Sequence, residues 1–367
     1  MKNLNSLITR FLLFFTTALF AQNLTIYVSD AANFTSGEFK IVKFDENGEN
    51  AEVFISTELA WPQDILFLED QNVVLISNLN SGKITKYDSS TGVFIDDFAS
   101  GIAGPTRMKI GADGYIYVLQ WSANTKVLRY DQDGTFIDEF TNTNMNQSIG
   151  LDWDDSGNLY VSSFNGAHIY KFDTTGASQG IFIDSNLSGP TNVKIDDGVI
   201  HVLDWNTGKL VRFNVSDGSY IDDFITGLTN PEGIDRLPNG NFLIGDNGTN
   251  SVREFDNGGN DQGEYTIGGG LITPNAVVLR DETLAIEEFE SNKVFVTPTV
   301  GNRFTLNQSV ISEYEALNIY NVSGVIIDTI DTRNSSIWNA SKYSEGLYFI
   351  SVTKGGKKAT QKIVIKN

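Results

Sequence analysis

One short pattern recurs along most of this 367-residue chain at a nearly constant interval. Each copy places a proline, or once a serine, before a short apolar segment, as in WPQDI, GPTRM and QSIGL. The positions are Pro62, Pro105, Ser148, Pro190, Pro231 and Pro274, and successive ones lie 41 to 43 residues apart. Self-similarity at such a period indicates a repeat architecture, because no single unit can bury its apolar residues alone. The period therefore excludes folds built around one non-repeating core.

Each repeat carries the pattern of four short strands. After Pro105, a first apolar segment is followed by a glycine turn and then by IYVLQW, KVLRYD and TFIDEF. Alternating apolar and polar residues bounded by Gly, Asn and Asp are typical of β-strands. Four such strands in about 42 residues form one blade of a β-propeller.

The two ends of the repeat region are incomplete in a complementary way. Residues 24–30, 39–45 and 51–55 have the pattern of second, third and fourth strands, whereas 275–281 have that of a first strand. We predict that they form one composite blade, which closes the ring and leaves no open sheet end. The predicted fold is all-β: a six-bladed propeller over 22–285, with five complete blades and one composite blade, followed by a small β-sandwich over 286–367.

The first 21 residues have the composition of a secretory signal peptide. Lys2 and Arg10 precede an apolar run from Phe11 to Phe20, and the small Ala21 follows it. The run is shorter than a membrane-spanning helix requires. A buried N-terminal helix is the alternative. No later segment is apolar enough to span a membrane, so the mature protein is expected to be soluble or attached to a surface.

Charge is distributed unevenly along the chain. Residues 22–286 contain 15 Lys and Arg against 38 Asp and Glu, whereas the remainder of the chain after them is nearly neutral. Such an acidic field repels nucleic acid and favours cations or neutral ligands as partners. The chain has no cysteine, which excludes disulfides, thiol nucleophiles and cysteine metal sites.

The repeats resemble the NHL-repeat family and the related gluconolactonase-like six-bladed propellers. The segment PEGIDRLPNGNFLIGDNGTNSVREFD (231–256) is most similar to the NHL pattern of a Pro-x-Gly strand, a Gly-Asn turn and a strand that ends in Asp. The resemblance extends over about residues 24–283. It implies the fold but not one function, because these propellers include binding proteins, scaffolds and enzymes.

The C-terminal residues 286–367 break the repeat and resemble another family. LNIYNVSG (317–324), SEGLYFISV (344–352) and the terminal KIVIKN (362–367) are similar to the C-terminal sorting domain of the Bacteroidetes type IX secretion pathway. VFVTPTVGN (294–302) departs from the Pro-Asn-Pro opening of that family. The resemblance implies that type IX secretion machinery is a partner. It also implies a secreted or outer-membrane surface location after Sec export through the periplasm.

Aromatic residues follow the second strands of three successive blades. They are Trp121, Phe164 and Trp205, and the corresponding ends elsewhere are Asp30, Asn78 and Asp246. The end of a second strand and the start of a first strand share the face around the axial channel, where ligands usually bind. We predict that these aromatics bind a ligand, with Arg107 and Asn192 nearby. Packing between blades is the alternative role.

Oxygen-bearing side chains are predicted to face this aromatic arc. They are Glu232, Asn275, Asp246, Asp30 and Asp64. Such a set could hold Ca²⁺, which takes about 6–8 oxygen ligands, whereas capping of turns is the alternative. Glu232 and Asn275 resemble ligand positions of the gluconolactonase-like propellers, which hold a divalent ion at the channel mouth. Their order is reversed here, and PNA lacks the glycine of the family motif.

Three functional hypotheses follow from the sequence. The first is a secreted or surface propeller that binds an extracellular carbohydrate or peptide at the channel mouth, without nucleic acid as a partner. The second is a hydrolase or lactonase that depends on a divalent metal. The third is a structural scaffold without a ligand pocket. The sequence alone does not decide whether the protein is an enzyme.

Overall fold

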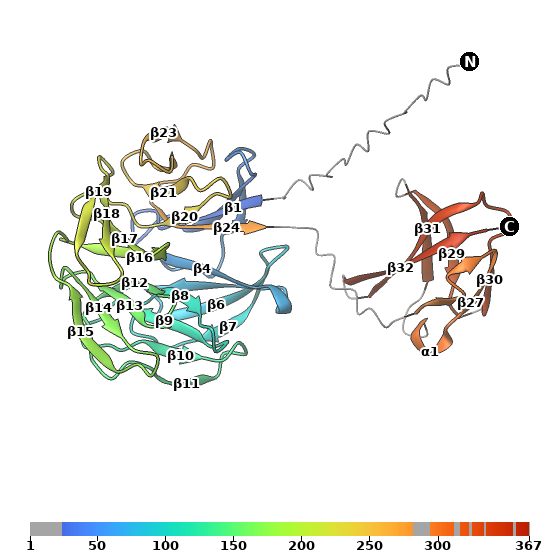
Figure 1. Ribbon diagram of the computed structural model, residues 1–367, viewed down its shortest axis with the longest axis horizontal. Coiled ribbons are helices and arrows are strands. Elements are labelled where there is room, and N and C mark those ends of the chain that lie inside the picture. Colours follow the sequence, from blue (N-terminus) through green and yellow to red (C-terminus); the bar gives the residue numbers. More distant parts are fainter. Residues whose placement is uncertain are drawn as a thin grey trace, which may run out of the picture. The chain divides into compact units, whose positions relative to one another are not determined.

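The computed structural model describes residues 24–281, 294–311, 316–322, 325–333, 335–354 and 357–366 (Figure 1). The chain forms two compact units that divide between Glu282 and Thr283. The predicted signal peptide, residues 1–21, and the predicted domain boundary at 285/286 lie outside the described residues. Within the described ranges, no helix has the length and hydropathy needed to cross a membrane.

Residues 24–281 form six four-stranded antiparallel sheets, which confirms the predicted propeller. Five are built from consecutive strands: β4 (Pro62–Leu68), β5 (Val73–Asn78), β6 (Lys83–Asp88) and β7 (Phe94–Ala99); β8 (Pro105–Ile110), β9 (Ile116–Gln120), β10 (Leu128–Tyr130) and β11 (Phe136–Glu139); β12 (Ser148–Trp153), β13 (Leu159–Ser163), β14 (His168–Phe172) and β15 (Ser178–Ile183); β16 (Pro190–Asp196), β17 (Val199–Asp204), β18 (Lys209–Asn214) and β19 (Tyr220–Ile225); β20 (Ile234–Arg236), β21 (Phe242–Asp246), β22 (Ser251–Phe255) and β23 (Asp261–Glu264). A short 3₁₀ turn, η1 (Glu69–Gln71), links β4 to β5.

The sixth sheet joins the two ends of the repeat region, as the sequence predicts. Its order is β24 (Pro274–Asp281), β1 (Leu24–Asp30), β2 (Lys40–Phe44) and β3 (Glu52–Ile55). β24 runs antiparallel to β1, with Leu24 opposite Asp281 and Val28 opposite Val277. First strands of neighbouring blades contact one another, as β4 does β8 and β12 does β16, so the first strands surround the axis of the ring (Figure 1).

The apolar core of the propeller is divided into six clusters, one at each contact between neighbouring blades. Leu75 and Ile84, for example, pack against Val118 of the next blade. Tyr27 and Ile41 of the composite blade likewise pack against Val74. This arrangement explains the apolar alternation in the strands, because each blade buries both faces of its inner strands against its neighbours.

The loops separate onto two faces because successive strands are antiparallel. The mouth face contains the loops from second to third strands and from each fourth strand to the next first strand: 31–39, 56–61, 79–82, 100–104, 121–127, 140–147, 164–167, 184–189, 205–208, 226–233, 247–250 and 265–273. The acidic face contains the other loops: 45–51, 69–72, 89–93, 111–115, 131–135, 154–158, 173–177, 197–198, 215–219, 237–241 and 256–260.

The second unit is a small β-sandwich, as predicted. Its sheets are β25 (Val296–Thr297), β27 (Arg303–Leu306) and β30 (Ile337–Asn339), and β26 (Val300–Gly301), β32 (Lys357–Ile365), β31 (Gly346–Lys354), β28 (Ala316–Asn321) and β29 (Ile326–Asp331), with one short helix, α1 (Gln308–Ile311). Phe304 stacks on Trp338 at 5.4 Å between ring centroids, inside a core that also contains Ile319 and Ile350.

Candidate functional site

A repeated backbone hydrogen bond defines equivalent positions around the mouth. The residue that follows each second strand donates its N–H to a carbonyl in the loop before the first strand of the same blade, at 2.7 to 3.1 Å. The six donors are Ala31, Leu79, Trp121, Phe164, Trp205 and Asn247. Three aromatic residues therefore do share one position of the ring, on three successive blades.

The predicted partners of these aromatics occupy a different position. In these three blades the second strands end one residue earlier, at Gln120, Ser163 and Asp204. These residues, with Asp30, Asn78 and Asp246, form a ring of polar side chains that are each at most 7% exposed. The predicted division of one ring into an aromatic arc and an oxygen-rich arc is therefore wrong, because it combines two adjacent positions.

Two neighbouring loops extend the aromatic set to five blades. Two blades have Leu79 or Ala31 instead of an aromatic residue at this position. In the blade of Leu79 the aromatic side chain comes from Trp61, and in the blade of Ala31 it comes from Phe34. Phe34 lies 4.9 Å from Trp61 and 6.1 Å from Trp205 between ring centroids, and Trp121 lies 5.4 Å from Phe164. All of these rings are half-buried. We call them the mouth aromatics: Phe34, Trp61, Trp121, Phe164 and Trp205.

Two of the mouth aromatics have an unusual backbone conformation. Phe34 has φ of 66° and Trp61 has φ of 56°, in the left-handed region that costs a bulky residue about 1–3 kcal/mol. The Asn80 side-chain amide holds this geometry by donating to the Phe34 carbonyl at 2.8 Å. Strain that the surrounding structure maintains is concentrated at binding and catalytic sites in proteins.

Asp30 and Asp246, two of the predicted metal ligands, cap turns instead. Asp30 accepts hydrogen bonds from the backbone N–H groups of Ala32, Ile272 and Thr273 at 2.8 to 3.0 Å. Asp246 accepts from two backbone N–H groups at 2.8 and 3.0 Å and from Arg253 Nη1 at 2.9 Å. Their oxygens are already engaged, so the structure does not bring these two residues into a metal site.

The other three predicted ligands surround an arginine at the axis. Arg107 Nη2 donates to the Asn275 carbonyl at 2.7 Å and lies 3.4 Å from Glu232 Oε1, and Arg107 Nη1 lies 3.9 Å from Asp64 Oδ1. With its amide oriented to satisfy its neighbours, Gln63 donates to Glu232 Oε1 at 2.9 Å. It then accepts from Trp61 Nε1 at 2.6 Å. We call this group the axial plug: Gln63, Asp64, Arg107, Glu232 and Asn275.

Burial dominates the acid–base properties of the plug. Desolvation raises the pKa of Glu232 from 4.5 to about 7, although Arg107 and the Asn275 amide oppose the rise. Burial also raises the pKa of Asp64, against the effect of the same guanidinium. A carboxyl group in this environment binds a proton more tightly than it does in water.

The plug does not fit a divalent cation. The Arg107 guanidinium already lies among the oxygens of Glu232, Asp64 and Asn275, so a second cation there would meet its positive charge. The described residues contain no group of three or more His, Cys, Asp or Glu side chains arranged to hold a metal ion. Arg107, predicted to contact a ligand at the mouth, is instead 5% exposed and lies among the other residues of the plug.

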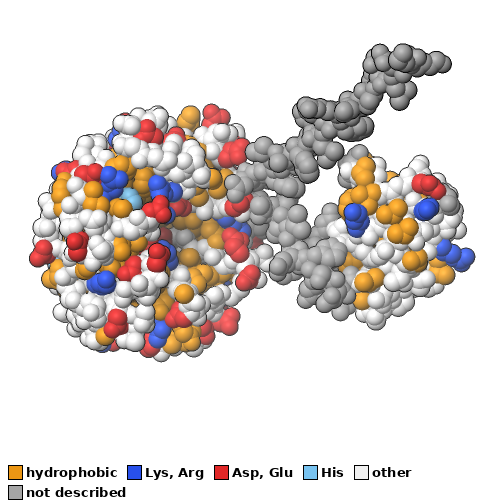
Figure 2. Space-filling model, in the orientation of Figure 1, with side chains coloured by type: hydrophobic (Ala, Val, Ile, Leu, Met, Phe, Trp, Pro, Cys, Tyr) orange, Lys and Arg blue, Asp and Glu red, His pale blue; other side chains and the backbone are white. Residues whose placement is uncertain are grey.

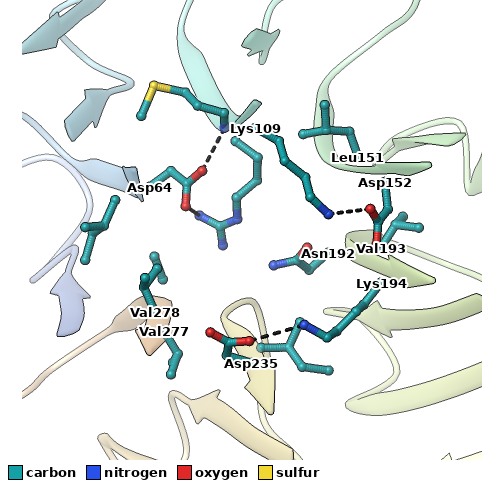
Figure 3. Close-up of a pocket in the computed structure, with 15 residues that line it drawn as sticks. Asp64, Lys109, Leu151, Asp152, Asn192, Val193, Lys194, Asp235, Val277 and Val278 are labelled. Atoms are coloured by element: carbon teal, nitrogen blue, oxygen red, sulfur yellow. Dashed lines mark hydrogen bonds and ion pairs between the residues drawn. The ribbon is translucent and has the colours of Figure 1, made fainter. Parts of the chain in front are cut away.

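A cavity of about 180 Å³ lies along the first strands on the far side of the plug. Asp64 and Arg107 line its inner end, and Asn192 points into it, away from the mouth where the sequence placed that residue (Figure 3). Further along the strands the lining contains Lys109, Asp152, Lys194 and Asp235. The cavity is therefore polar and lies at the end of the channel that faces the acidic loops.

Several of these residues were missed by sequence reasoning although a signal was present. Trp61 directly precedes Pro62, at the point where other blades have Gly104 or Gly189. Lys109, Asp152, Lys194 and Asp235 all stand four residues after the proline or serine of their repeat. Aligning the repeats by position would have found these four charges on successive blades. No local signal marks Phe34, which lies in the longest loop between a second and a third strand.

Comparison with known proteins identifies the C-terminal unit. Residues 294–366 match the family described as "Secretion system C-terminal sorting domain". The C-terminal unit is a type IX secretion sorting domain. Such a domain directs its protein to the type IX secretion machinery, so the chain is secreted or displayed at the outer-membrane surface.

The propeller is similar in fold to several solved structures. They include a chain of the nidogen/laminin complex (TM-score 0.59, 16% identity, 70% of this chain and 98% of that one). For a protein of unknown function from Bacteroides caccae the TM-score is 0.57 at 14% identity, over 71% of this chain and 100% of that one. For a gluconolactonase from Xanthomonas campestris the TM-score is 0.52 at 14% identity, over 77% of this chain and 91% of that one. At these identities the likeness shows the propeller fold and not an activity.

Proposed function

We propose that the exported propeller binds an uncharged carbohydrate at its mouth face. The observation that carries the proposal is the set of mouth aromatics, half-buried side chains from five blades that converge on one face. Large flat rings offer extensive contact area at low entropic cost, and the apolar faces of sugar rings can pack on them. The strained backbone at Phe34 and Trp61 supports the same reading.

The charge of the mouth face favours a neutral ligand. Its twelve loops contain only five charged residues, in a propeller that is otherwise strongly acidic: Glu38, Glu58, Lys126, Asp184 and Glu232. Glu232 is buried in the plug and Lys126 pairs with Glu139 at 2.7 Å. Asn206, which follows Trp205 in the chain, is exposed, and its amide oxygen can accept a hydrogen bond from a hydroxyl group.

A peptide ligand and a metal-dependent reaction are less well supported. Peptides commonly add to a free strand edge, and the free edges here are those of the fourth strands at the rim of the ring. A lactonase of the gluconolactonase type needs a divalent ion. Glu232 and Asn275 resemble the ion ligands of that family, but here the Arg107 guanidinium lies beside both residues, where the ion would have to bind. No observation in the propeller favours either alternative over carbohydrate binding.

Mutation of the tryptophans tests the proposal. Trp121→Ala and Trp205→Ala are each expected to weaken binding of neutral oligosaccharides about tenfold or more, because each removes one stacking surface. Binding is measured by calorimetry against a panel of plant, fungal and bacterial oligosaccharides. Trp153→Phe is the matched control, because Trp153 packs against Tyr117 between blades, 5.1 Å away between ring centroids.

Three outcomes would contradict carbohydrate binding. One is the absence of saturable binding to any neutral oligosaccharide in the panel. Another is an equal loss of affinity in Trp153→Phe and in the two mouth variants. The third is binding of a peptide library by a surface that requires the same tryptophans, which would keep the site and change the ligand class.

A further inference from the structure

An arc of alternating charges from four of the six blades lines the cavity on the far side of the axial plug. Lys109, Asp152, Lys194 and Asp235 come from four successive first strands, and their side chains converge on the cavity (Figure 3). Lys109 pairs with Asp152, and Lys194 Nζ lies 3.2 Å from Asp235 Oδ1. Each of these four blades thus offers the opposite charge to its neighbour, and the four charges cancel.

The carboxylates of this lining are occupied by the backbone. Besides its lysine, Asp152 accepts from the Trp153 N–H at 2.9 Å and from the Ile195 N–H of the next blade at 2.8 Å. Asp235 repeats the pattern with the N–H groups of Arg236 and Leu279, both at 2.9 Å. Asp64 Oδ2 accepts from the Met108 N–H at 2.7 Å. These acids join neighbouring blades, and most of their acceptor capacity is used.

The cationic groups of the same lining retain free donors. An ammonium group has three N–H donors, and among the described residues Lys109 and Lys194 each donate to a single acceptor. Arg107 Nη1 is buried and makes no hydrogen bond, with Asp64 Oδ1 3.9 Å away, and the whole Arg107 side chain is only 6% exposed. The Asn192 side chain also makes no hydrogen bond to a described residue. The cavity therefore presents more donors than acceptors.

We propose that this axial cavity binds a small organic carboxylate. Its carboxylate oxygens would accept from Arg107 Nη1, from the two lysines and from the Asn192 amide, which are the donors that the fold leaves unused. The cavity is small, at about 180 Å³, which favours a small acid over a larger one. This site is separate from the mouth aromatics, because the axial plug lies between them.

Exposure along the lining indicates where the ligand enters. The Arg107 side chain is 6% exposed, that of Lys194 is 31% and that of Lys109 is 44%, so the cavity opens toward the acidic face. A bound polyanion would remain close to many acidic side chains at this opening and would be repelled by them. A small acid is close to them only while it enters the cavity. The site therefore selects for small anions over nucleic acids and acidic polysaccharides.

Calorimetric titration of the purified full chain with acetate, succinate and inorganic phosphate tests this proposal. Saturable binding of acetate or succinate is expected with a Kd on the order of millimolar. Lys109→Met and Lys194→Met are expected to weaken it about tenfold or more, because each removes a charge-assisted donor. Lys209→Met is the matched control, since Lys209 forms a similar ion pair with Asp223 at 2.6 Å outside the cavity.

Asn192→Ala provides a second variant, which removes no hydrogen bond between described residues and should fold normally. It is expected to weaken carboxylate binding about threefold or more while leaving the melting temperature unchanged. Three results would overturn the proposal: no saturable carboxylate binding up to about 50 mM, binding of phosphate alone, or an equal loss in Lys209→Met. Oligosaccharide affinity should be unchanged in all of these variants, so the two proposals fail independently.

Discussion

The two faces of the propeller differ sharply in charge. The difference helps to distinguish acidic side chains that stabilise turns from side chains that are available to a ligand. The acidic-face loops contain fourteen Asp and Glu residues and no Lys or Arg, whereas the mouth-face loops contain four acids and one lysine. Acidic side chains are visible over much of the propeller in Figure 2. The molecule thus presents one face with many negative charges and another with few charges of either sign.

Much of the acidity has a local structural cause. Asp131 Oδ1 accepts from the N–H groups of Asp133 and Thr135, at 3.0 and 2.7 Å, and so holds the turn between a third and a fourth strand. Asp256 does the same with Gly258 and Asn260. Aspartate is favoured in such turns because its carboxylate is bonded to its own backbone. The side chains of the mouth aromatics have no comparable role in a turn. Their presence is therefore a stronger indication of function than that of the acidic residues.

The largest expected effect comes from the plug that separates the faces. Arg107→Met leaves Glu232 and Asp64 buried without their cation, and should lower the free energy of unfolding by about 3–5 kcal/mol. Urea denaturation measures the change. Lys126→Met, which breaks the exposed pair with Glu139, should cost at most about 1 kcal/mol. Equal losses in both variants would show that the plug does not stabilise the ring.

The next effect is a pH dependence that originates in Glu232. The unfolded residue loses its proton near pH 4.5, whereas the folded one keeps it until about pH 7. The folded state binds more protons over this interval, so its stability falls as pH rises from 4.5 to 7, by about 3 kcal/mol at most. Asp64, whose pKa is also raised by burial, acts in the same direction.

Substitution of Glu232 isolates this contribution. Glu232→Gln should flatten the decline in stability, because the side chain can no longer titrate. Urea denaturation at pH 5, 6, 7 and 8 gives the slope. Glu38→Gln, an exposed change on the same face, should retain the wild-type slope. A Glu232→Gln protein with an unchanged slope would rule out Glu232 as its source.

The smallest effect distinguishes acids that hold turns from acids that only add charge. Asp154 accepts from the N–H groups of Ser156 and Asn158, both at 2.9 Å, and from the Tyr160 hydroxyl at 3.0 Å. Asp154→Ala should therefore lower the free energy of unfolding by about 1–2 kcal/mol. The neighbouring Asp155 is exposed, and Asp155→Ala should leave stability unchanged. Equal changes in the free energy of unfolding in the two variants would mean that charge, not hydrogen bonding, determines how these acids affect stability.

The sequence was sufficient for the fold because the repeat constrains it many times over. Each proline position predicts a first strand, and the complementary ends of the repeat region predict the pairing of β24 with β1. The ends of the second strands could not be predicted to the residue. Apolar alternation continues from Leu119 to Trp121, but the strand ends at Gln120, and the Trp121 N–H donates to the Gly104 carbonyl in the loop before β8. A hydropathy pattern does not show at which of these residues the strand ends.

The axial plug was beyond prediction for a geometric reason. Arg107 and Glu232 are separated by 125 residues and come from different blades, and nothing local in either repeat indicates their contact. Near the axis the ring is narrow enough for a long side chain to reach across it. Sequence reasoning therefore found the carboxylates and the arginine but assigned them to separate sites.

The composite blade also sets an order of events in folding. Leu24 and Asp281 are paired neighbours, although nearly the whole propeller lies between them in the chain. Contacts of such long sequence separation form late and slowly, because a very large loop has to close first. Until residues 274–281 arrive, β1 has an unpaired inner edge, which other strands can join. An exported chain with this closure cannot complete its ring before almost all of the propeller has been delivered.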